Sequence, residues 1–270
     1  MKFGRDNTNQ KLTMKFILLL FALIVQMNVF GQASSFQSGE VLKFKIKYGW
    51  FKASEASLSV STSNLRDQSM YHIVAEGKST GMLDVFFRVR NRYESYVGIQ
   101  DGLSHRFIRK TSEGGHKKDK MIDFYQDKKL AVVNNYKKDT VSSHSLDGKA
   151  QDMISAYYHL REIVDINTIQ QDDEFTLNMF FDEENFAFKA KYVGDEILKT
   201  DFGTIKAMVF KPYVQADRVF KEKESVTIWI SKDKNKIPLK MEAKLAVGSL
   251  TAHLFEFRGL ANPFNVIFDN

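Results

Sequence analysis

From Gly39 onward, apolar and polar residues alternate along most of the chain, and this period of two limits the fold more than any other feature. In residues 41–48, VLKFKIKY, the side chains of Leu42, Phe44 and Ile46 fall on one face and the lysines between them on the other. Such alternation is typical of a β-strand with one buried face. Similar runs recur at residues 56–63, 70–79, 84–98, 104–126, 129–141, 174–194, 196–214 and 225–259.

Short turn sequences, such as Gly114–Gly115 and Asp201–Gly203, separate or interrupt these runs. Helical patterns do not alternate with the strands, so neighbouring strands should be antiparallel. The 23 Phe and 10 Tyr residues suit half-buried sheet surfaces. We therefore predict a mainly β fold of antiparallel curved sheets or partial barrels in two lobes, with one central helix near residues 152–164.

That helix is expected in the sequence QDMISAYYHLREIV, residues 151–164, with Asp152 or Asp147 as its cap. A helical wheel gives one apolar face, formed by Met153, Ala156, Tyr157, Leu160, Ile163 and Val164. The opposite face carries Ser155, Tyr158, His159 and Glu162, with Ile154 and Arg161 at the border. We predict that this helix joins lobes 33–150 and 165–270, that Tyr158 makes a second contact, and that Arg161 reaches a buried carboxylate or carbonyl cluster.

Ser155, His159 and Glu162 are spaced so that they could meet along one helix face, which raises the question of nucleophilic catalysis. A catalytic serine normally lies on a sharp turn beside free backbone N–H groups, whereas the N–H groups inside a helix are already bonded. We therefore interpret this face as polar surface and assign no catalytic residue. The histidines form no zinc-binding pattern, so no metal site and no cofactor is predicted.

The N-terminus has the pattern of a secretory signal peptide. Lys11 and Lys15 precede an apolar run at residues 16–30, and small residues follow it. The run is short for a membrane anchor, which is the alternative interpretation. We predict a signal peptide at residues 1–32, cleavage near Gln32, and export to the periplasm or cell envelope of a Gram-negative-type bacterium; Met14 is an alternative start.

The composition adds two constraints on the exported protein. The chain has no Cys, so its stability must come from a core rather than from disulfides. Four basic residues and one acidic residue precede Gln32, so the formal charge of +6 falls to +3 without them. This modest charge does not favour nucleic acid as a partner; a lipid, a glycan or an envelope protein is the expected kind of partner.

Arg88, Arg90 and Arg92 share one face of a predicted strand, together with nearby acidic residues such as Glu94. They are either a solvated sheet face or an anion site, because guanidinium groups bind phosphate and carboxylate groups through paired hydrogen bonds. The weak candidates for ligand binding are therefore Arg88, Arg90, Arg92, Tyr158 and Arg161.

Several segments, in order, resemble the exported bacterial family called domain of unknown function 3108. The most specific are Asp152-x-x-Ser155-Ala156-x-Tyr158-x-x-Arg161 and Trp229-x-Ser231-x-Asp233, followed by Pro238. The resemblance runs from about Gly39 to Leu260, and Ala53-Ser54 departs from the expected glycine-containing turn. It implies a secreted, β-rich envelope protein with one central helix and brings no established activity.

Three functions are consistent with these observations. The first is a non-catalytic envelope protein that binds an amphipathic or anionic ligand or an envelope partner. The second is a periplasmic hydrolase of glycan or ester, and the third is a purely structural interaction module. A deep polar cleft with converging carboxylates would favour the hydrolase, and an apolar groove would favour the binding protein.

Overall fold

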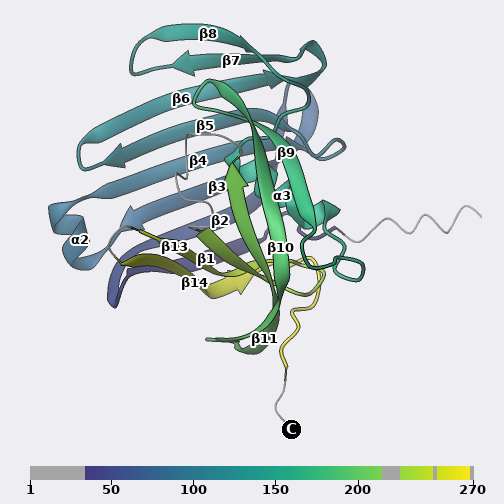
Figure 1. Cartoon of the computed structure of the whole chain (residues 1–270). Coiled ribbons are helices and arrows are strands. Elements are labelled where there is room, and N and C mark those ends of the chain that lie inside the picture. The colour runs from purple at the N-terminus through teal and green to yellow at the C-terminus, as the bar shows by residue number, and fades with distance from the viewer. Residues whose placement is uncertain (1–33, 215–225, 246–247, 268–270) are drawn as a thin grey trace, which may run out of the picture. The chain divides into compact units, whose positions relative to one another are not determined.

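The computed structural model describes residues 34–214, 226–245 and 248–267, in which the chain forms fourteen strands and two α-helices (Figure 1). The first half holds β1 (Val41–Tyr48), β2 (Phe51–Leu65), β3 (Gln68–Ser79), α2 (Gly81–Phe86), β4 (Val89–Gly98), β5 (Ser104–Glu113), β6 (His116–Tyr125), the 3₁₀ helix η1 (Gln126–Lys128), β7 (Leu130–Asn135) and β8 (Thr140–Ser145). Then follow α3 (Met153–Ile163), β9 (Glu174–Phe181), β10 (Glu184–Thr200), β11 (Gly203–Val214), β12 (Val226–Ser231), β13 (Pro238–Lys244) and β14 (Ser249–Arg258).

All fourteen strands of the described residues belong to one sheet, in the order β8-β7-β6-β5-β4-β3-β2-β1-β14-β13-β12-β11-β10-β9. Each half is an antiparallel meander, and β1 pairs with β14 to join the two, for example Tyr48 with Leu250. The predicted mainly β, antiparallel fold is confirmed. The sheet continues through both halves instead of being divided between two lobes, because the first and last strands pair. The boundaries 33–150 and 165–270 for two lobes stay a prediction.

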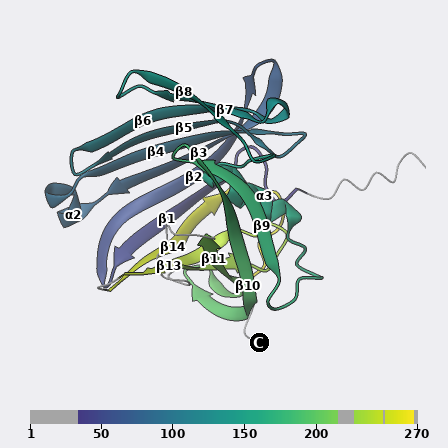
Figure 2. The ribbon, with the colours of Figure 1, turned by 45° about the horizontal axis from the view of Figure 1, so that its top comes forward.

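The sheet is not closed, and within the described residues β8 and β9 are its edge strands, with Gln151 forming an isolated bridge to Met179 of β9. It curls, so that the tip of the β9–β10 hairpin lies against strands of the first half (Figure 2). There Asp182 accepts a hydrogen bond from Arg109 at 2.9 Å, and Glu183 accepts one from Lys120 at 2.8 Å. The same region holds the core around Phe107, Phe124 and Phe180.

Helix α3 lies between the halves and contacts both β4 and β9. Its observed bounds, Met153–Ile163, confirm the predicted central helix. The predicted apolar face of the helix is only partly buried, because Met153 and Ile163 are 48% and 45% exposed. Tyr158 and Ser155, assigned to the polar face, are buried. The reason is that both sides of the helix are covered, one by the sheet and the other by the chain that precedes β1.

Helix α2 is absent from the sequence expectations, which placed residues 84–98 in one strand. The strand β4 begins only at Val89, and Gly81 starts the helix with a positive φ of 58°. The predicted Gly114–Gly115 turn is confirmed between β5 and β6, where both glycines have positive φ. Neither helix in the described ranges is long and apolar enough to span a membrane. The predicted signal peptide at residues 1–32 lies outside the described residues.

Candidate functional site: a cleft beside helix α3

The start of α3 is fixed by a buried carboxylate. Asp152 caps the helix: its Oδ1 accepts hydrogen bonds from the backbone N–H groups of Ile154 at 2.7 Å and Ser155 at 2.9 Å. Its Oδ2 accepts the hydroxyl protons of Ser95 and Ser104, each at 2.6 Å, from β4 and β5. Burial raises the pKa of Asp152, and these donors oppose the rise. The helix is thereby bonded to the sheet at its first turn.

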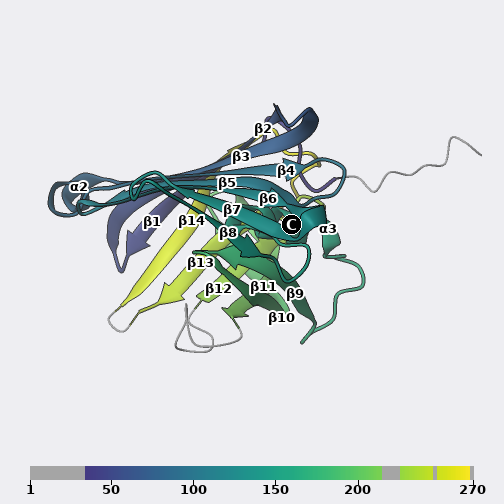
Figure 3. The same ribbon diagram turned by 90° about the horizontal axis from the view of Figure 1, so that it is seen from above.

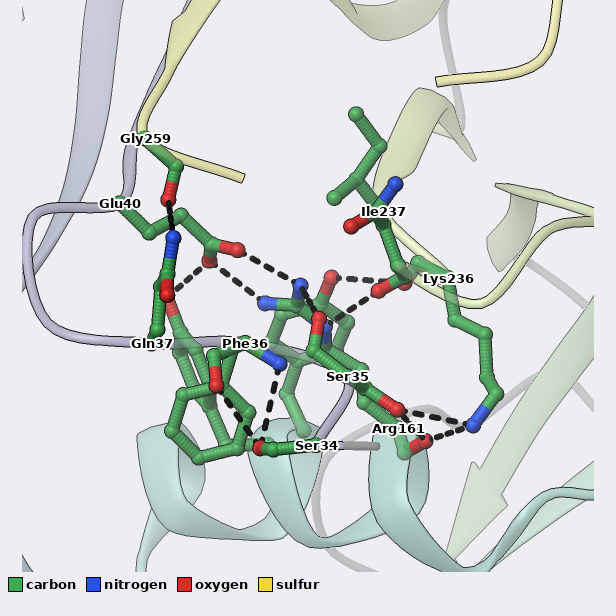
Figure 4. Close-up of polar contacts among 12 residues, drawn as sticks. Ser34, Ser35, Phe36, Gln37, Glu40, Arg161, Lys236, Ile237 and Gly259 are labelled. Atoms are coloured by element: carbon green, nitrogen blue, oxygen red, sulfur yellow. Dashed lines mark hydrogen bonds and ion pairs between the residues drawn. The ribbon is translucent and has the colours of Figure 1, made fainter. Parts of the chain in front are cut away.

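The other end of α3 is fixed by Arg161, which is 2% exposed. Its Nη1 and Nη2 donate to the two carboxylate oxygens of Glu40 at 2.6 and 2.7 Å. Nη2 also donates to the Ser35 carbonyl at 2.8 Å, and Nε donates to the Asn235 carbonyl at 2.9 Å. Figure 4 shows this guanidinium between the N-terminal segment and the loop before Ile237. The prediction that Arg161 reaches a buried carboxylate and carbonyl cluster is confirmed.

The loop at residues 232–237 completes this arrangement. Asp233 Oδ1 accepts hydrogen bonds from the Ser231 hydroxyl and from the backbone N–H groups of Asn235 and Lys236. Lys236 Nζ donates to the Ser35 hydroxyl at 2.9 Å and to the Arg161 carbonyl. We call the buried set Ser35, Glu40, Asp152, Arg161, Asp233 and Lys236 the α3 junction. It includes residues from both of the most specific sequence motifs.

A cleft of about 390 Å³ lies beside the junction. Its floor is apolar and aromatic, formed by Phe36, Tyr71, Val97 and Tyr158. The Phe36 ring packs on Tyr71 at 4.9 Å and edge-on to Tyr158 at 4.7 Å, measured between ring centroids. The volume of this cleft lies within the range typical of small-molecule sites.

The rim of the cleft is polar and carries two carboxylates. It includes Ser34, Asp101, His159 and Glu162. Burial lowers the pKa of His159, and the Glu162 charge opposes that shift, so the ring is neutral at physiological pH. Glu162 Oε1 accepts hydrogen bonds from the Ser34 hydroxyl and the Ser35 N–H, both at 2.9 Å. Asp101 accepts one from His105 Nε2 at 2.9 Å. The rim thus offers carboxylate oxygens and a neutral imidazole.

The predicted ligand-binding residues separate into two groups. Tyr158 lines the cleft floor, while its hydroxyl lies 3.3 Å from Glu40; burial and the Glu40 charge raise its pKa, so it stays neutral. Arg161 is adjacent, but Glu40 and two carbonyls already occupy its guanidinium. Arg88, Arg90 and Arg92 lie near or in β4, whose Val89 end is opposite the Gly98 end that lines the cleft.

The three arginines differ in how far they are already paired. Arg90 forms a bidentate ion pair with Asp84: Nη1 donates to Oδ1 at 2.6 Å and Nη2 to Oδ2 at 3.0 Å. Arg92 bonds Glu94 at 2.8 Å and Glu76 at 2.6 Å. Arg88 is 70% exposed and stands 3.7 Å from Asp84. The ion pairs of Arg90 and Arg92 favour the solvated-face interpretation for those two, and their role in ligand binding stays a prediction.

Ser155 is placed for structure rather than for nucleophilic attack. Its Oγ accepts a hydrogen bond from the Asp152 N–H at 2.8 Å and is fully buried. A Ser–His contact does occur elsewhere, between Ser142 and His144 Nε2 at 2.9 Å, with Glu183 4.0 Å from the same nitrogen. A catalytic histidine uses opposite ring nitrogens for nucleophile and carboxylate, which this geometry does not provide. In the described residues no group of three or more His, Asp or Glu side chains could hold a metal ion.

Sequence reasoning missed Ser34, Phe36 and Glu40 as parts of this region. They precede the first alternating run, and their partners on α3 are more than 110 residues away along the chain. The only local signal is Glu40 beside Gly39, an acid at the point where a strand begins. That signal is too common to identify a buried partner of arginine.

Comparison with known proteins gives a family and a fold. The family model described as Protein of unknown function (DUF3108) matches residues 43–254, as the resemblance predicted. A β-barrel-like protein of domain of unknown function DUF1849 from Brucella abortus is similar in structure, with a TM-score of 0.50 and 10% identity, over 82% of this chain and 97% of that chain. That likeness supports the curled antiparallel sheet and concerns the fold alone.

Two further solved structures match with lower TM-scores. A presumed lipoprotein from Parabacteroides distasonis has a TM-score of 0.32 and 14% identity, over 84% of this chain and 100% of that one. A presumed exported protein with a YmcC-like fold from Bacteroides fragilis has a TM-score of 0.31 and 11% identity, over 82% and 96%. No curated protein matches the chain.

Proposed function

Because this chain belongs to the family described as Protein of unknown function (DUF3108), a description that names no activity, we propose a function from the geometry of the chain itself. The protein binds an amphipathic molecule in the cleft beside α3, without converting it, and does so in the cell envelope. The observation that supports this most strongly is the combination of an aromatic floor with a polar rim in a cleft of about 390 Å³.

The two surfaces of the cleft fit two parts of one ligand. The rings of Phe36 and Tyr71 and the side chain of Val97 would cover an apolar moiety. At the rim, Glu162 and Asp101 would accept hydrogen bonds from a neutral or cationic polar group. The acidic rim disfavours an anionic head group at this place, since like charges repel.

Binding without conversion is supported by the roles of the rim groups. Glu162 Oε1 already accepts two hydrogen bonds, and the Oγ of the buried Ser155 accepts the Asp152 N–H in the capping box of α3. The envelope location rests on Lys11, Lys15 and the apolar run at residues 16–30. N-terminal sequencing of the exported protein should begin near Gln32. A protein that still carries residues 16–30 and needs detergent for extraction would contradict this.

Mass spectrometry of molecules retained by the natively purified protein tests the binding proposal. Ile99 lines the cleft and is 42% exposed, so Ile99→Glu should place a charge in the cleft at little cost in stability. We expect the parent to retain an amphipathic compound. Ile99→Glu should retain at least about fivefold less of it. Ile197→Glu is the matched control, since Ile197 is 61% exposed on β10 and does not line the cleft.

Three outcomes would overturn the proposal. Equal retention by Ile99→Glu and the parent would place the ligand elsewhere. A parent that retains nothing amphipathic would favour the structural module. Conversion of the retained compound class by the purified parent would favour the hydrolase.

A further inference from the structure

Large apolar side chains stand exposed at the ends of the strands that point away from the cleft. Trp50 and Phe51 lie at the β1–β2 turn and are 82% and 52% exposed. In α2 and just after it, Met82, Val85, Phe86 and Phe87 are 74%, 79%, 80% and 47% exposed. We call these six side chains the tip surface. In α2, all of whose residues are described, no side chain is buried.

The tip surface extends over neighbouring connections at one end of the strands. The Trp50 and Phe51 rings stack with centroids 3.6 Å apart. The chain entering α2 is bonded to β2, since the Thr80 N–H donates to the Ala53 carbonyl at 3.0 Å. The Phe87 ring lies against Gly114 of the β5–β6 turn. Figure 3 shows α2 at the end of the sheet, beyond the ends of the strands.

The segments that bear the tip surface are basic. Residues 45–55, 76–90 and 110–118 contain nine Lys and Arg and four Asp and Glu. The side chains of Lys52 and Lys78 are 48% and 61% exposed and share the Glu55 carboxylate, at 2.7 and 3.8 Å. The Arg88 side chain is 70% exposed and lies 3.7 Å from Asp84. Exposed rings with cations around them match the boundary of an anionic bilayer, where aromatic rings enter the head-group region and cations meet lipid phosphates.

We propose that the tip surface docks the protein on an anionic lipid bilayer. The rings of Trp50 and Phe86 enter the head-group region, and Lys52, Lys78 and Arg88 lie at the level of the phosphates. This proposal uses a different surface from the ligand cleft and does not depend on it. Because β4 begins at Val89, two residues after Phe87 of the tip surface, and ends at Gly98 of the cleft, the docked protein holds its cleft away from the bilayer.

The fluorescence of Trp50 reports directly on docking of the tip surface. It is measured on the protein purified from the cells that make it. The chain has two tryptophans, so Trp229→Phe leaves Trp50 as the only one. Vesicles of phosphatidylcholine with one quarter phosphatidylglycerol should shift the Trp50 emission to shorter wavelength, and bromine-labelled lipid should quench it. Vesicles of phosphatidylcholine alone, or added salt, should weaken the effect, because salt screens the cations.

Two double variants distinguish binding through the tip surface from nonspecific binding through any exposed apolar side chain. Trp50→Ser with Phe86→Ser should weaken co-sedimentation with the anionic vesicles by about tenfold or more, since two rings are lost. The control is Val141→Ser with Ile197→Ser, which removes two exposed apolar side chains, 69% and 61% exposed, outside the tip surface. Any contribution from residues 16–30 is the same in both pairs.

Two results would overturn the proposal. The first is an unchanged Trp50 emission together with equal sedimentation of the two double variants. The second is a dimer of the parent that Trp50→Ser with Phe86→Ser converts to monomer while vesicle binding stays the same. That result would assign the tip surface to a second copy of the chain.

Discussion

The α3 junction buries ionisable side chains, whereas the tip surface exposes large apolar ones. At the junction, the ionisable side chains of Arg161, Glu40 and Asp152 are 0–2% exposed. At the tip surface, Trp50 and Phe86 are 82% and 80% exposed. Both arrangements are unfavourable for the isolated groups, since buried charge loses hydration and exposed apolar surface orders water.

The two regions differ in where the contacts that offset this cost are found. At the junction they are internal, because carboxylate and carbonyl oxygens accept from Arg161 and four donors meet Asp152. At the tip surface the described structure covers Trp50 and Phe86 very little. An internally satisfied polar cluster is a structural device. An apolar cluster that the described residues leave uncovered is available for contact with a further molecule, and the substitutions below test that distinction.

The largest effect is expected at the junction. Arg161→Ala leaves the Glu40 carboxylate buried without its cation, which should lower the free energy of unfolding by about 3–5 kcal/mol. Chemical denaturation of variant and parent measures the loss. As a control, Arg161→Met combined with Glu40→Met should recover part of it, because no unpaired charge remains. A loss below about 1 kcal/mol for Arg161→Ala would show that the junction does not hold the two halves together.

Ser155→Ala should have a smaller effect on the same helix. It leaves the buried Asp152 N–H without its acceptor, which should cost about 1–2 kcal/mol in thermal or chemical unfolding. Ligand retention should be unchanged, and a serine-directed fluorophosphonate should not label Ser155. Covalent labelling there would revive the hydrolase. A larger loss of stability than in Arg161→Ala would show that the cap, and not the ion pair, anchors α3.

Much of the fold could be predicted because its signals are local. Alternation located the strands, and Asp152 followed by an apolar helical pattern located α3 to within about two residues. The position of Arg161 at the border of the apolar face was enough to predict a buried acceptor cluster. Each of these depends on residues close together in sequence.

The remaining features depend on distant segments or on short ones. The pairing of β1 with β14 brings together strands some 200 residues apart, so no local pattern could show that both halves share one sheet. Ser34 and Phe36 cover the side of α3 that the wheel assigned to solvent, and the Phe36 ring buries Tyr158. Helix α2 has only six residues, fewer than two turns, so its sequence could be taken for a strand.

A charge substitution at the tip surface sharpens the comparison further. The Arg90 guanidinium, followed by the Ser79 hydroxyl, lowers the pKa of Asp84 to about 2, so this carboxylate stays charged at the pH of vesicle experiments. Asp84→Asn releases Arg90 from its ion pair. Since one cation near an anionic bilayer contributes about 1 kcal/mol, anionic vesicle affinity should rise about fivefold. Asp182→Asn, with the same change in charge at the β9–β10 turn, should leave it nearly unchanged; an equal rise would mean that net charge alone sets the affinity.

The smallest effect on stability is expected from Phe86→Ala. Because the ring is 80% exposed, its removal should change the free energy of unfolding by about 0.5 kcal/mol or less. Phe180→Ala removes the same ring from a fully buried site and should cost about 3–5 kcal/mol. Chemical denaturation of the two variants in the absence of lipid makes the comparison directly. A near-zero loss for Phe86, together with weaker vesicle binding, means that the ring contributes to docking and not to folding. A loss of 2 kcal/mol or more would mean instead that Phe86 is covered within the protein, and the tip surface would then be part of its core.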